Sequence, residues 1–447
     1  MVVGGESKSI SNKAVPHISV LASPGMGHVI PLWEFAKHLV THHGFKVSFL
    51  NITTEASEAQ NQLVHSSNLP RNLHVIDLPQ VDLSGIVNDK TSIVAQLSVN
   101  VRESLRCLKS ILVEIGNPQA LVIDLFCTQA FDVCKELSIP TYSFFTASTH
   151  LLAFSLYLPK LDRDVEGEFV DLPEPVQVPG CSPIRTEDLL DQVRDRKSEE
   201  YRWYLYHLSR INMADGILLN TWHDLESDTI RGIREDPFYK EVHTPPLYPV
   251  GPLIKEIDPL NETAVQCLTW LDKQPSDSVL FVALGSGGTL TTEQITELAW
   301  GLELSKQRFV WVVRTPSDAS STGTFFNVGG DVNDPKTYLP EGFIERTREV
   351  GLLIPSWAPQ MEVLKHRSTG AFLSHCGWNS TLESLAHGVP IIAWPLYAEQ
   401  RMNATTLAHD QFGVAVKPVA EPGKKVIGRK ETERVVRLVI EGEKGRL

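Results

Sequence analysis

Short apolar runs alternate with amphipathic segments through the first half of the chain. Apolar side chains recur at helical spacing within residues 29–42, 99–115 and 129–137. Runs rich in β-branched and other apolar residues predict strands at residues 17–22, 45–51, 73–78, 120–126 and 216–221. Because strands that alternate with helices build a parallel sheet with helices on both faces, this half predicts a doubly wound α/β domain.

The alternation stops at residues 245–262, where prolines and a polar run interrupt it. We therefore expect a linker there, between an N-terminal domain of residues 1–244 and a C-terminal domain of residues 263–447. Beyond the linker the pattern predicts helices at 292–304 and 381–387 and strands at 279–284, 309–314, 352–355, 370–374 and 390–393. Two such domains place a cleft between the carboxyl ends of two parallel sheets, where open α/β folds bind ligands.

Composition narrows the possible functions. The chain has 447 residues, with 41 Lys+Arg against 54 Asp+Glu and a net charge of −13, which argues against a nucleic-acid partner. We see neither a signal peptide nor an apolar run long enough to cross a bilayer, and we expect no membrane insertion. The six cysteines have no CxxC spacing, which argues against a zinc site or a disulfide scaffold and favours reduced thiols in the cytoplasm. They are Cys107, Cys127, Cys134, Cys181, Cys267 and Cys376. Nothing indicates an obligate partner, so we expect a monomer.

The segment 357–400 is the richest in candidate chemistry. It reads WAPQMEVLKHRSTGAFLSHCGWNSTLESLAHGVPIIAWPLYAEQ. The predicted strand 370–374 runs through Gly377 into a helix, and such a helix start presents free backbone N–H groups and a positive dipole end to an anion. A diphosphate therefore fits here without a metal ion. Taken alone, the glycine turns also fit ordinary strand-to-helix geometry.

This segment resembles the signature sequence of plant UDP-dependent glycosyltransferases that act on small molecules, from its first Trp to its last Gln. The motifs PGMGHVIPL, VIDLF, SFFTAS and ALGSGGTL resemble the same family, so the resemblance covers essentially the whole chain. It implies the GT-B architecture, in which two Rossmann-like domains face a cleft, with the acceptor bound by the N-terminal domain and the UDP-sugar by the C-terminal domain. It also implies that the donor needs no metal or other cofactor. The order of motifs is most similar to the branch that glucosylates simple phenolics such as hydroquinone, monolignols and coumarins.

The resemblance also implies which side chains bind the donor. Trp357 would stack on uracil beside backbone hydrogen bonds from Ala358, while Gln360 and Glu383 would contact the ribose. The other implied contacts reach the diphosphate, from Ser286, His375, Gly377, Asn379 and Ser380, or the sugar, from Thr146, Trp378, Tyr397, Glu399 and Gln400. Considered singly, Trp357 also fits a core position, and Glu383 also fits a helix capping box with Ser380.

Two of these positions bear on the choice of sugar. Relatives with His in place of Gln400 use galactose, and some relatives that use sugar acids carry Arg in place of Trp378, so both residues favour UDP-glucose. Many members carry Asp where this chain has Glu399. The sequence does not say what that departure does to sugar choice.

His28 and Asp124 are the candidate catalytic pair. His28 follows Gly25-Met26-Gly27 at the start of a predicted helix and Asp124 ends a predicted strand, so both lie at the sheet edge that faces the cleft. A phenolic hydroxyl needs a base at neutral pH; histidine has a suitable pKa, and a carboxylate behind it fixes its tautomer. Both residues match the family's His–Asp dyad. A lone histidine here also fits a structural role at the helix start.

Acceptor recognition has a weaker signal. Phe126, Phe144 and Phe145 follow strand ends at the same edge and are candidates to line an apolar acceptor pocket, although each also fits the core. The sequence as a whole predicts an inverting glucosyltransferase that moves glucose from UDP-glucose to a hydroxyl of a small phenolic acceptor and yields a β-O-glucoside.

Four alternatives remain at this point. A nicotinamide-dependent dehydrogenase would need a clean GxGxxG helix start, which is lacking. A metal-dependent transferase would need Asp-x-Asp after a strand, whereas Asp162 and Asp164 lie in a charged stretch. The family's C-terminal helix, which crosses back onto the first domain, has no counterpart before Leu447; weak domain closure would then leave a catalytically weak UDP-sugar-binding protein. A transferase that uses a different UDP-sugar is the fourth.

Overall fold

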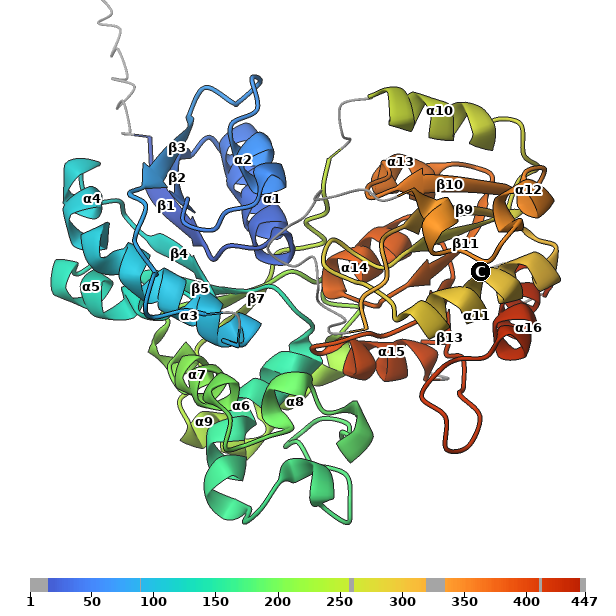
Figure 1. Ribbon diagram of the computed structural model, residues 1–447. Coiled ribbons are helices and arrows are strands. Elements are labelled where there is room, and N and C mark those ends of the chain that lie inside the picture. Colours follow the sequence, from blue (N-terminus) through green and yellow to red (C-terminus); the bar gives the residue numbers. More distant parts are fainter. Residues whose placement is uncertain (1–14, 89, 257–260, 319–333, 410–411, 443–447) are drawn as a thin grey trace, which may run out of the picture.

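The chain folds around two parallel β-sheets, one from each half of the sequence (Figure 1). The computed structural model describes residues 15–442, except residues 89, 257–260, 319–333 and 410–411. The strand order is β3-β2-β1-β4-β5-β6-β7 in the first sheet and β10-β9-β8-β11-β12-β13 in the second. In both sheets the chain therefore starts in the middle, moves outward, and returns to the other side of its first strand, as in doubly wound folds.

The first sheet contains the strands β1 (His17–Ala22), β2 (Lys46–Ile52), β3 (Leu73–Leu78), β4 (Leu121–Asp124), β5 (Thr141–Phe145), β6 (Gly216–Leu219) and β7 (Leu247–Pro249). Its α-helices are α1 (Met26–His43), α2 (Glu58–Val64), α3 (Ile93–Ser104), α4 (Leu108–Glu114), α5 (Ala130–Leu137), α6 (Thr149–Asp164), α7 (Glu199–Leu208), α8 (Ser227–Glu235) and α9 (Pro237–Glu241). Short 3-10 helices are η1 (Leu105–Cys107), η2 (Phe169–Asp171), η3 (Thr186–Asp188), η4 (Asp191–Val193) and η5 (Ile211–Met213).

The second sheet contains the strands β8 (Val279–Ala283), β9 (Arg308–Val313), β10 (Gly351–Pro355), β11 (Thr369–Ser374), β12 (Ile391–Ala393) and β13 (Ala415–Val416). Its helices are α10 (Glu262–Leu271), α11 (Thr292–Ser305), α12 (Phe343–Thr347), α13 (Gln360–Lys365), α14 (Trp378–Ala386), α15 (Gln400–Ala408) and α16 (Arg429–Glu441), with the 3-10 helix η6 (Pro335–Thr337). The GT-B architecture of two Rossmann-like domains is thus confirmed.

Apolar side chains pack on both faces of the first sheet. Phe144 packs with Val20 on one face and Phe145 packs with Leu21 on the other, because successive side chains of a strand point to opposite faces. All four side chains are fully buried. A sheet buried on both faces explains why its strands read as near-continuous apolar runs in the sequence.

Among the elements that differ from the sequence-based expectation are the helix α3 and the strands β5 and β7. The helix expected over 99–115 begins earlier, at Ile93, because the Ser92 hydroxyl caps it by accepting from the Ala95 N–H, and it breaks at Leu105–Cys107. The strand β5 was not among the predicted strands. Finally, β7 occupies Leu247–Pro249 within the expected linker and pairs with β6. Proline is tolerated there because β7 is an edge strand.

The two sheets position the site through their reversal points. In the first sheet β1 pairs with β4, and in the second β8 pairs with β11. Loops that leave the carboxyl ends of such central strands diverge to opposite faces and open a crevice, which is where this class of fold binds ligands. His28 follows β1, Asp124 ends β4, Ser286 follows β8 and His375 follows β11.

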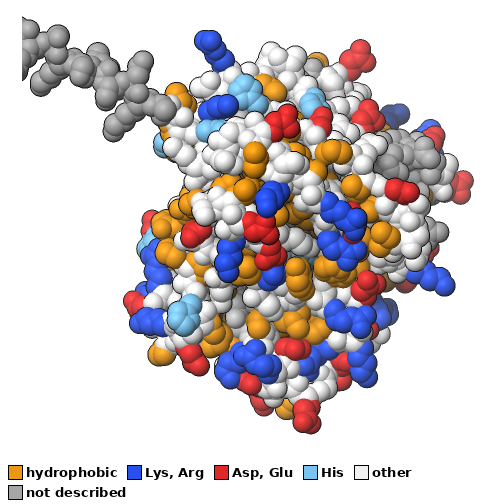
Figure 2. Space-filling model, turned by 90° about the vertical axis from the view of Figure 1, so that its left-hand side faces the viewer, with side chains coloured by type: hydrophobic (Ala, Val, Ile, Leu, Met, Phe, Trp, Pro, Cys, Tyr) orange, Lys and Arg blue, Asp and Glu red, His pale blue; other side chains and the backbone are white. Residues whose placement is uncertain are grey.

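The surface and the helices place further limits on partners. Figure 2 shows one face of the molecule, on which Lys and Arg side chains are interspersed with Asp and Glu rather than gathered in a basic patch. Among the described residues, no helix is both long enough and apolar enough to cross a membrane.

Candidate functional site

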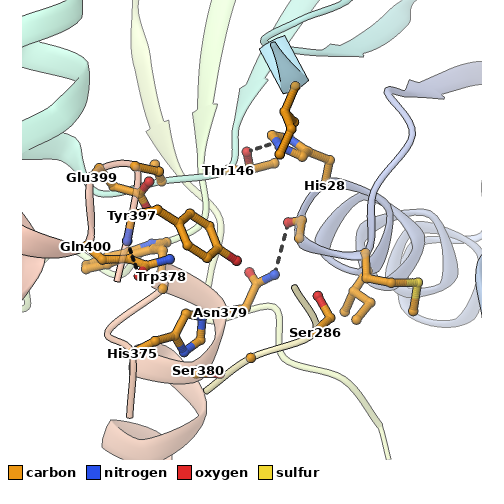
Figure 3. Close-up of a pocket in the computed structure, with 18 of the residues that line it drawn as sticks. His28, Thr146, Ser286, His375, Trp378, Asn379, Ser380, Tyr397, Glu399 and Gln400 are labelled. Carbon is orange, nitrogen blue, oxygen red and sulfur yellow. Dashed lines mark hydrogen bonds between the residues drawn. The ribbon is translucent and has the colours of Figure 1, made fainter. Parts of the chain in front are cut away.

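A cavity of about 800 Å³ lies between the two domains (Figure 3). Its walls come from the strand ends and following loops of both sheets. Of the residues expected at the site, these line it: His28, Phe126, Phe145, Thr146, Ser286, Trp357, Ala358, Gln360, His375, Gly377, Trp378, Asn379, Ser380, Glu383, Tyr397, Glu399 and Gln400. Asp124 and Phe144 do not line it.

His28 and Asp124 form a hydrogen-bonded pair at the edge of this cavity. His28 lies in the first turn of α1, and its Nδ1 is 2.9 Å from Oδ2 of Asp124. The other carboxylate oxygen accepts from the Ser23 hydroxyl at 2.6 Å and from the Phe126 backbone N–H at 3.0 Å. Asp124 is fully buried behind a histidine that is 17% exposed. The carboxylate is therefore fixed and shielded, while the imidazole faces the cavity.

The surroundings shift the pKa values of this pair in opposite directions. Burial lowers the pKa of His28, but the charge of Asp124 and the hydrogen bond to it outweigh burial and raise this pKa above its usual value. Burial raises the pKa of Asp124, but the charge of His28 and its hydrogen bond, with the bonds from Ser23 and Phe126, lower it below its usual value. Asp124 is consequently a carboxylate at neutral pH, and Nδ1 of His28 carries the proton between them.

Two further side chains contact the His28 ring. The Thr146 hydroxyl, just after β5, lies 3.2 Å from Nδ1 of His28. The Phe126 ring packs edge-on against the imidazole with centroids 5.3 Å apart. With Nδ1 occupied by Asp124 and Thr146, the nitrogen left for a substrate is Nε2.

The turn between β11 and α14 lies across the cavity from His28 (Figure 3). The His375 ring lies between two glycines, since a Cβ on Gly285 or on Gly377 would come within 2.4 Å or 2.5 Å of Nε2. Gly285 also has φ +75°, which disfavours any other residue. Gly285 and Gly377 thus allow the backbones of both turns to approach the imidazole.

The polar groups of this turn suit an anion. Burial and the nearby Arg314 lower the pKa of His375 to about 4, so its ring is neutral at pH 7. Within the described part of the chain, Nδ1 of His375 is buried without a hydrogen-bond partner. Backbone N–H groups at the start of α14 point to the same space. A neutral imidazole donor, a helix N-terminus and the Ser286 turn together fit a diphosphate.

The nucleoside side of the cavity is lined by Trp357 and its neighbours. The Trp357 side chain is 38% exposed, so it is not a core residue. The Gln360 amide nitrogen donates to Oγ of Ser380 at 2.9 Å and to a carboxylate oxygen of Glu383 at 2.5 Å. Ser380 and Glu383 lie one turn apart on α14, which fixes their hydroxyl and carboxylate on one side of the helix.

The loop between β12 and α15 carries the residues expected at the sugar. The Gln400 side-chain oxygen accepts from the backbone N–H groups of Leu396, at 2.9 Å, and Tyr397, at 3.0 Å. Its amide nitrogen is the donor that the side chain can offer to a ligand. Burial raises the pKa of Glu399 above its usual value, and burial with the charge of Glu399 raises that of Tyr397 to about 12.

Two side chains of α14 reach across to the first domain. The Trp378 indole N–H donates to the Asn220 carbonyl oxygen at 2.8 Å, and the Asn379 amide donates to the Gly27 carbonyl oxygen at 3.0 Å. The first turn of α14 therefore lies at the expected donor site and also contacts the first turn of α1, which carries His28. Neither bond has a signal in the sequence.

The expectation that Phe144 lines an acceptor pocket is wrong. Phe144 is fully buried in the core on the α1 side of the sheet, where its ring lies 5.5 Å from that of Phe35. Phe145 points to the opposite face and does line the cavity, as does Phe126. Their pocket wall is completed by apolar residues that the sequence did not single out, which are Ile93, Val94, Leu97, Leu125, Leu151 and Leu190.

Arg314 is a further cavity residue that the sequence pattern did not single out. It follows β9, and its guanidinium donates to the carbonyl oxygens of Gly285, of Gly288 at 3.1 Å and of Ser356 at 3.1 Å. These carbonyls belong to the turn that carries Ser286 and to the loop that carries Trp357. One side chain thus connects the diphosphate side of the cavity to the nucleoside side. Its only sequence signal is its position at a strand end.

The described residues offer no cluster of metal ligands. Among them, no group of three or more His, Cys, Asp and Glu side chains is arranged to hold a metal ion.

Known proteins share this sequence and geometry. Residues 239–433 match the family described as UDP-glucoronosyl and UDP-glucosyl transferase. Hydroquinone glucosyltransferase of Rauvolfia serpentina is 45% identical over 435 residues, which cover 96% of this chain and 90% of that protein. UDP-glycosyltransferase 72B1 of Arabidopsis thaliana is 46% identical over 439 residues, which cover 96% of this chain and 89% of that protein.

Solved structures of UDP-glycosyltransferases are also similar to this chain. The structure of Phytolacca americana UGT2 complexed with UDP-2fluoro-glucose and pterostilbene superposes with a TM-score of 0.84 at 43% identity, covering 97% of this chain and 91% of that one. Two Rossmann-like domains that enclose a site for a nucleoside diphosphate define a nucleotide-dependent transferase. The chain belongs to the UDP-glycosyltransferase family.

Proposed function

We propose that this protein is an inverting glucosyltransferase that transfers glucose from UDP-glucose to a hydroxyl group of a small phenolic acceptor. The observation that carries the proposal is the hydrogen bond between Nδ1 of His28 and the buried Asp124, on the opposite side of the cavity from the His375 turn. A base on one side and a diphosphate site on the other are the two parts that a single displacement needs.

His28 is the proposed base. Its Nε2 accepts the proton of the phenolic hydroxyl while the oxygen attacks the anomeric carbon of glucose. The imidazolium that forms is stabilised by Asp124, which keeps its negative charge throughout. The bond between the anomeric carbon and the diphosphate oxygen breaks as the new bond forms, so an α-linked donor yields a β-glucoside and UDP.

The diphosphate leaves toward the second domain. Its negative charge is balanced by hydrogen bonds from the neutral His375 ring, from Asn379 and Ser286, and from the N–H groups at the start of α14. Uracil stacks on the partly exposed Trp357 ring beside Ala358, and the ribose hydroxyls bind Glu383 and Gln360. The bond between Gln360 and Glu383 supports this role, because it holds both polar groups at the same point of the cavity wall.

Glucose is the proposed sugar. The carboxylate of Glu399 and the amide nitrogen of Gln400 offer an acceptor and a donor to neighbouring hydroxyls, as a neutral sugar requires. Thr146 and the aromatic Trp378 and Tyr397 line the same part of the cavity. The relative from Rauvolfia serpentina is a glucosyltransferase, which supports the same sugar here.

A phenolic acceptor fits the wall next to His28. Phe126 and Phe145 place aromatic rings there, and apolar side chains of α3 and α6 continue the wall. The relatives support this class of acceptor, because one is a hydroquinone glucosyltransferase and another was solved with pterostilbene.

We also propose a monomer that works in the cytoplasm. One chain supplies both walls of the cavity, which supports a monomeric working unit. All six cysteines are free thiols, which supports a reducing compartment.

The test is UDP release from UDP-glucose with a panel of phenols, with the anomeric configuration of the product read by proton NMR. We expect turnover of simple phenols to a β-glucoside, and a loss of at least about a hundredfold in kcat for His28→Ala, the usual range for a general base. His38→Ala, on the exposed part of α1, is the matched control. An α-glucoside, or equal activity of wild type and His28→Ala, would contradict the mechanism.

A further inference from the structure

The sugar loop, residues 394–399 between β12 and α15, has an unusual backbone at Ala398. Its φ is +51°, in the left-handed region that residues with a Cβ rarely adopt. The neighbouring N–H groups of Leu396 and Tyr397 are held by Gln400, directly after the loop. The Ala398 N–H is held from the other domain: it donates to Oδ2 of Asp191 at 2.9 Å.

Asp191 belongs to the first domain, and its position there is fixed. It begins η4, between the buried side chains of Leu190 and Val193, which pack into the hydrophobic core of that domain. Its second oxygen, Oδ1, is paired with Arg401 in the first turn of α15. One carboxylate from the first domain therefore binds both the sugar loop and the helix that follows it.

The same segment makes a second and separate contact with α15. Asp188 accepts from Thr405 at 3.0 Å and from Lys417 at 3.4 Å, and neither partner belongs to the sugar loop. These two contacts hold the domains together in the same region. They differ in that only Asp191 touches the backbone beside Glu399 and Gln400.

Asp191 also lines the cavity, next to Leu190 and Gln192 of the acceptor wall. Figure 3 shows Tyr397 and Glu399, of the loop that Asp191 holds, projecting into the cavity together with Gln400, the first residue of α15. The carboxylate thus lies where the acceptor wall of one domain meets the sugar loop of the other. Separation of the domains would release Ala398, the residue before Glu399.

We propose that Asp191 is a positioning residue for the donor sugar, which holds Ala398 in its left-handed conformation so that Glu399 and Gln400 meet the glucose hydroxyls only when the two domains are together. This inference rests on the proposed glucosyl transfer. Binding of the sugar then depends on a residue of the acceptor domain, whereas binding of the nucleoside diphosphate does not.

The test compares UDP with UDP-glucose, because UDP lacks the group that the sugar loop contacts. In calorimetric titrations of Asp191→Ala, we expect the Kd of UDP to stay within about twofold and that of UDP-glucose to rise about fivefold or more, the loss expected for one or two hydrogen bonds. With hydroquinone as acceptor, kcat should fall about tenfold or more, since a displaced sugar is poorly aligned for attack. Asp191→Asn retains an oxygen for the Ala398 N–H and should recover most of the UDP-glucose affinity.

Matched variants separate positioning from domain contact. Arg401→Gln removes the ion pair but leaves the bond to Ala398, and Lys417→Met weakens the neighbouring contact of Asp188; both should keep the ratio of the two Kd values near that of wild type. Equal weakening of UDP and UDP-glucose in Asp191→Ala, or the same selective loss in Lys417→Met, would overturn the proposal. Thermal melts show whether each variant is folded. A wild type that binds UDP-glucose but transfers no glucose would refute the proposed function and leave the binding comparison intact.

Discussion

The indole N–H of Trp378 in the second domain donates a 2.8 Å hydrogen bond to the backbone carbonyl oxygen of Asn220 in the first domain. Asn220 is fully buried, and its side chain holds Leu253 through one bond to the backbone N–H, at 2.7 Å, and one to the carbonyl, at 3.1 Å. Trp378 is thus bound to Asn220, the same residue whose side chain holds Leu253, where the chain leaves the first domain. Its N–H group is used between domains and is not available to the sugar.

The first prediction follows from that bond. Trp378→Phe keeps an aromatic ring at the cavity but leaves the buried Asn220 carbonyl without its donor, which costs about 1–3 kcal/mol. We expect a melting temperature lower by a few degrees and a higher KM for UDP-glucose, measured by calorimetry and steady-state kinetics. Trp270→Phe on α10, away from the cavity, is the control. An unchanged melting temperature in Trp378→Phe would show that the bond does not hold the domains.

The second prediction concerns the pH dependence set by Asp124. Protonation of His28 removes the base, so kcat/KM should fall on the acid side with a pKa above the usual value for histidine, as Asp124 raises it. Asp124→Asn removes the charge that raises this pKa and leaves burial, which lowers it. We expect the acid limb to move to lower pH while the plateau of kcat/KM drops about 10²- to 10⁴-fold.

Ser23→Ala is the graded control for that experiment. It removes one donor to Asp124 but leaves the bond between Asp124 and His28 in place. We expect kcat/KM within about tenfold of wild type, because the carboxylate loses one hydrogen bond but keeps those from His28 and from the Phe126 N–H. If Asp124→Asn shifted the acid limb to higher pH, the assignment of His28 as the group that titrates would be wrong.

The third prediction concerns Arg314. Its guanidinium reaches carbonyl oxygens in two loops at once, and a lysine has a single ammonium that cannot. Arg314→Lys should therefore loosen the Ser286 turn and the Trp357 loop together and weaken UDP binding about tenfold, measured by titration calorimetry. Arg308→Lys, at the other end of β9 and bonded to Gln274 at 3.1 Å, should leave the Kd of UDP unchanged.

Much of the fold could be predicted because long buried strands have a strong local signal. The strand β1 begins and ends at the predicted residues, since it is a buried apolar run bounded by polar or turn residues. The strand β3 also begins and ends as predicted, although only its two end residues are buried. The strand β7 could not be predicted in the same way. It has three residues, one of them a proline, and depends on pairing with β6 rather than on its own pattern.

Some features of the candidate site could likewise be predicted from the sequence, and others could not. Side chains at the ends of central strands, such as His28 and His375, follow from the topology and the motif together. The bonds from Asp191 to Ala398 and from Trp378 to Asn220 join residues 207 and 158 positions apart, and no local pattern of apolar and polar residues encodes such contacts. For the same reason Phe144 was assigned to the wrong face: the alternation within β5 is known only when the strand itself is recognised.

The last prediction is a loss of stability in acid that arises from two buried neutral histidines. Burial lowers the pKa of His207 to about 3, where its ring lies between the hydroxyls of Thr128 and Ser98. Burial likewise lowers that of His375 to about 4. Both folded pKa values lie below the unfolded value near 6.5, so the unfolded chain binds protons that the folded chain does not. The contribution of these two histidines to stability should therefore be constant above about pH 7 and fall as the pH drops through 6.5 toward 4.

The size of this effect and its origin are both measurable. Each of the two histidines should cost about 2–3 kcal/mol between pH 6.5 and 4.5, at about 1.4 kcal/mol per pH unit. Chemical unfolding of His207→Gln should show lower stability at pH 7.5 but a shallower decline in acid, so that its curve approaches that of wild type near pH 5. His43→Gln is the control, because the His43 side chain is already exposed to solvent in the folded chain. Parallel curves for wild type and His207→Gln would mean that His207 does not take up its proton on unfolding, and the acid sensitivity would then have to come from other groups.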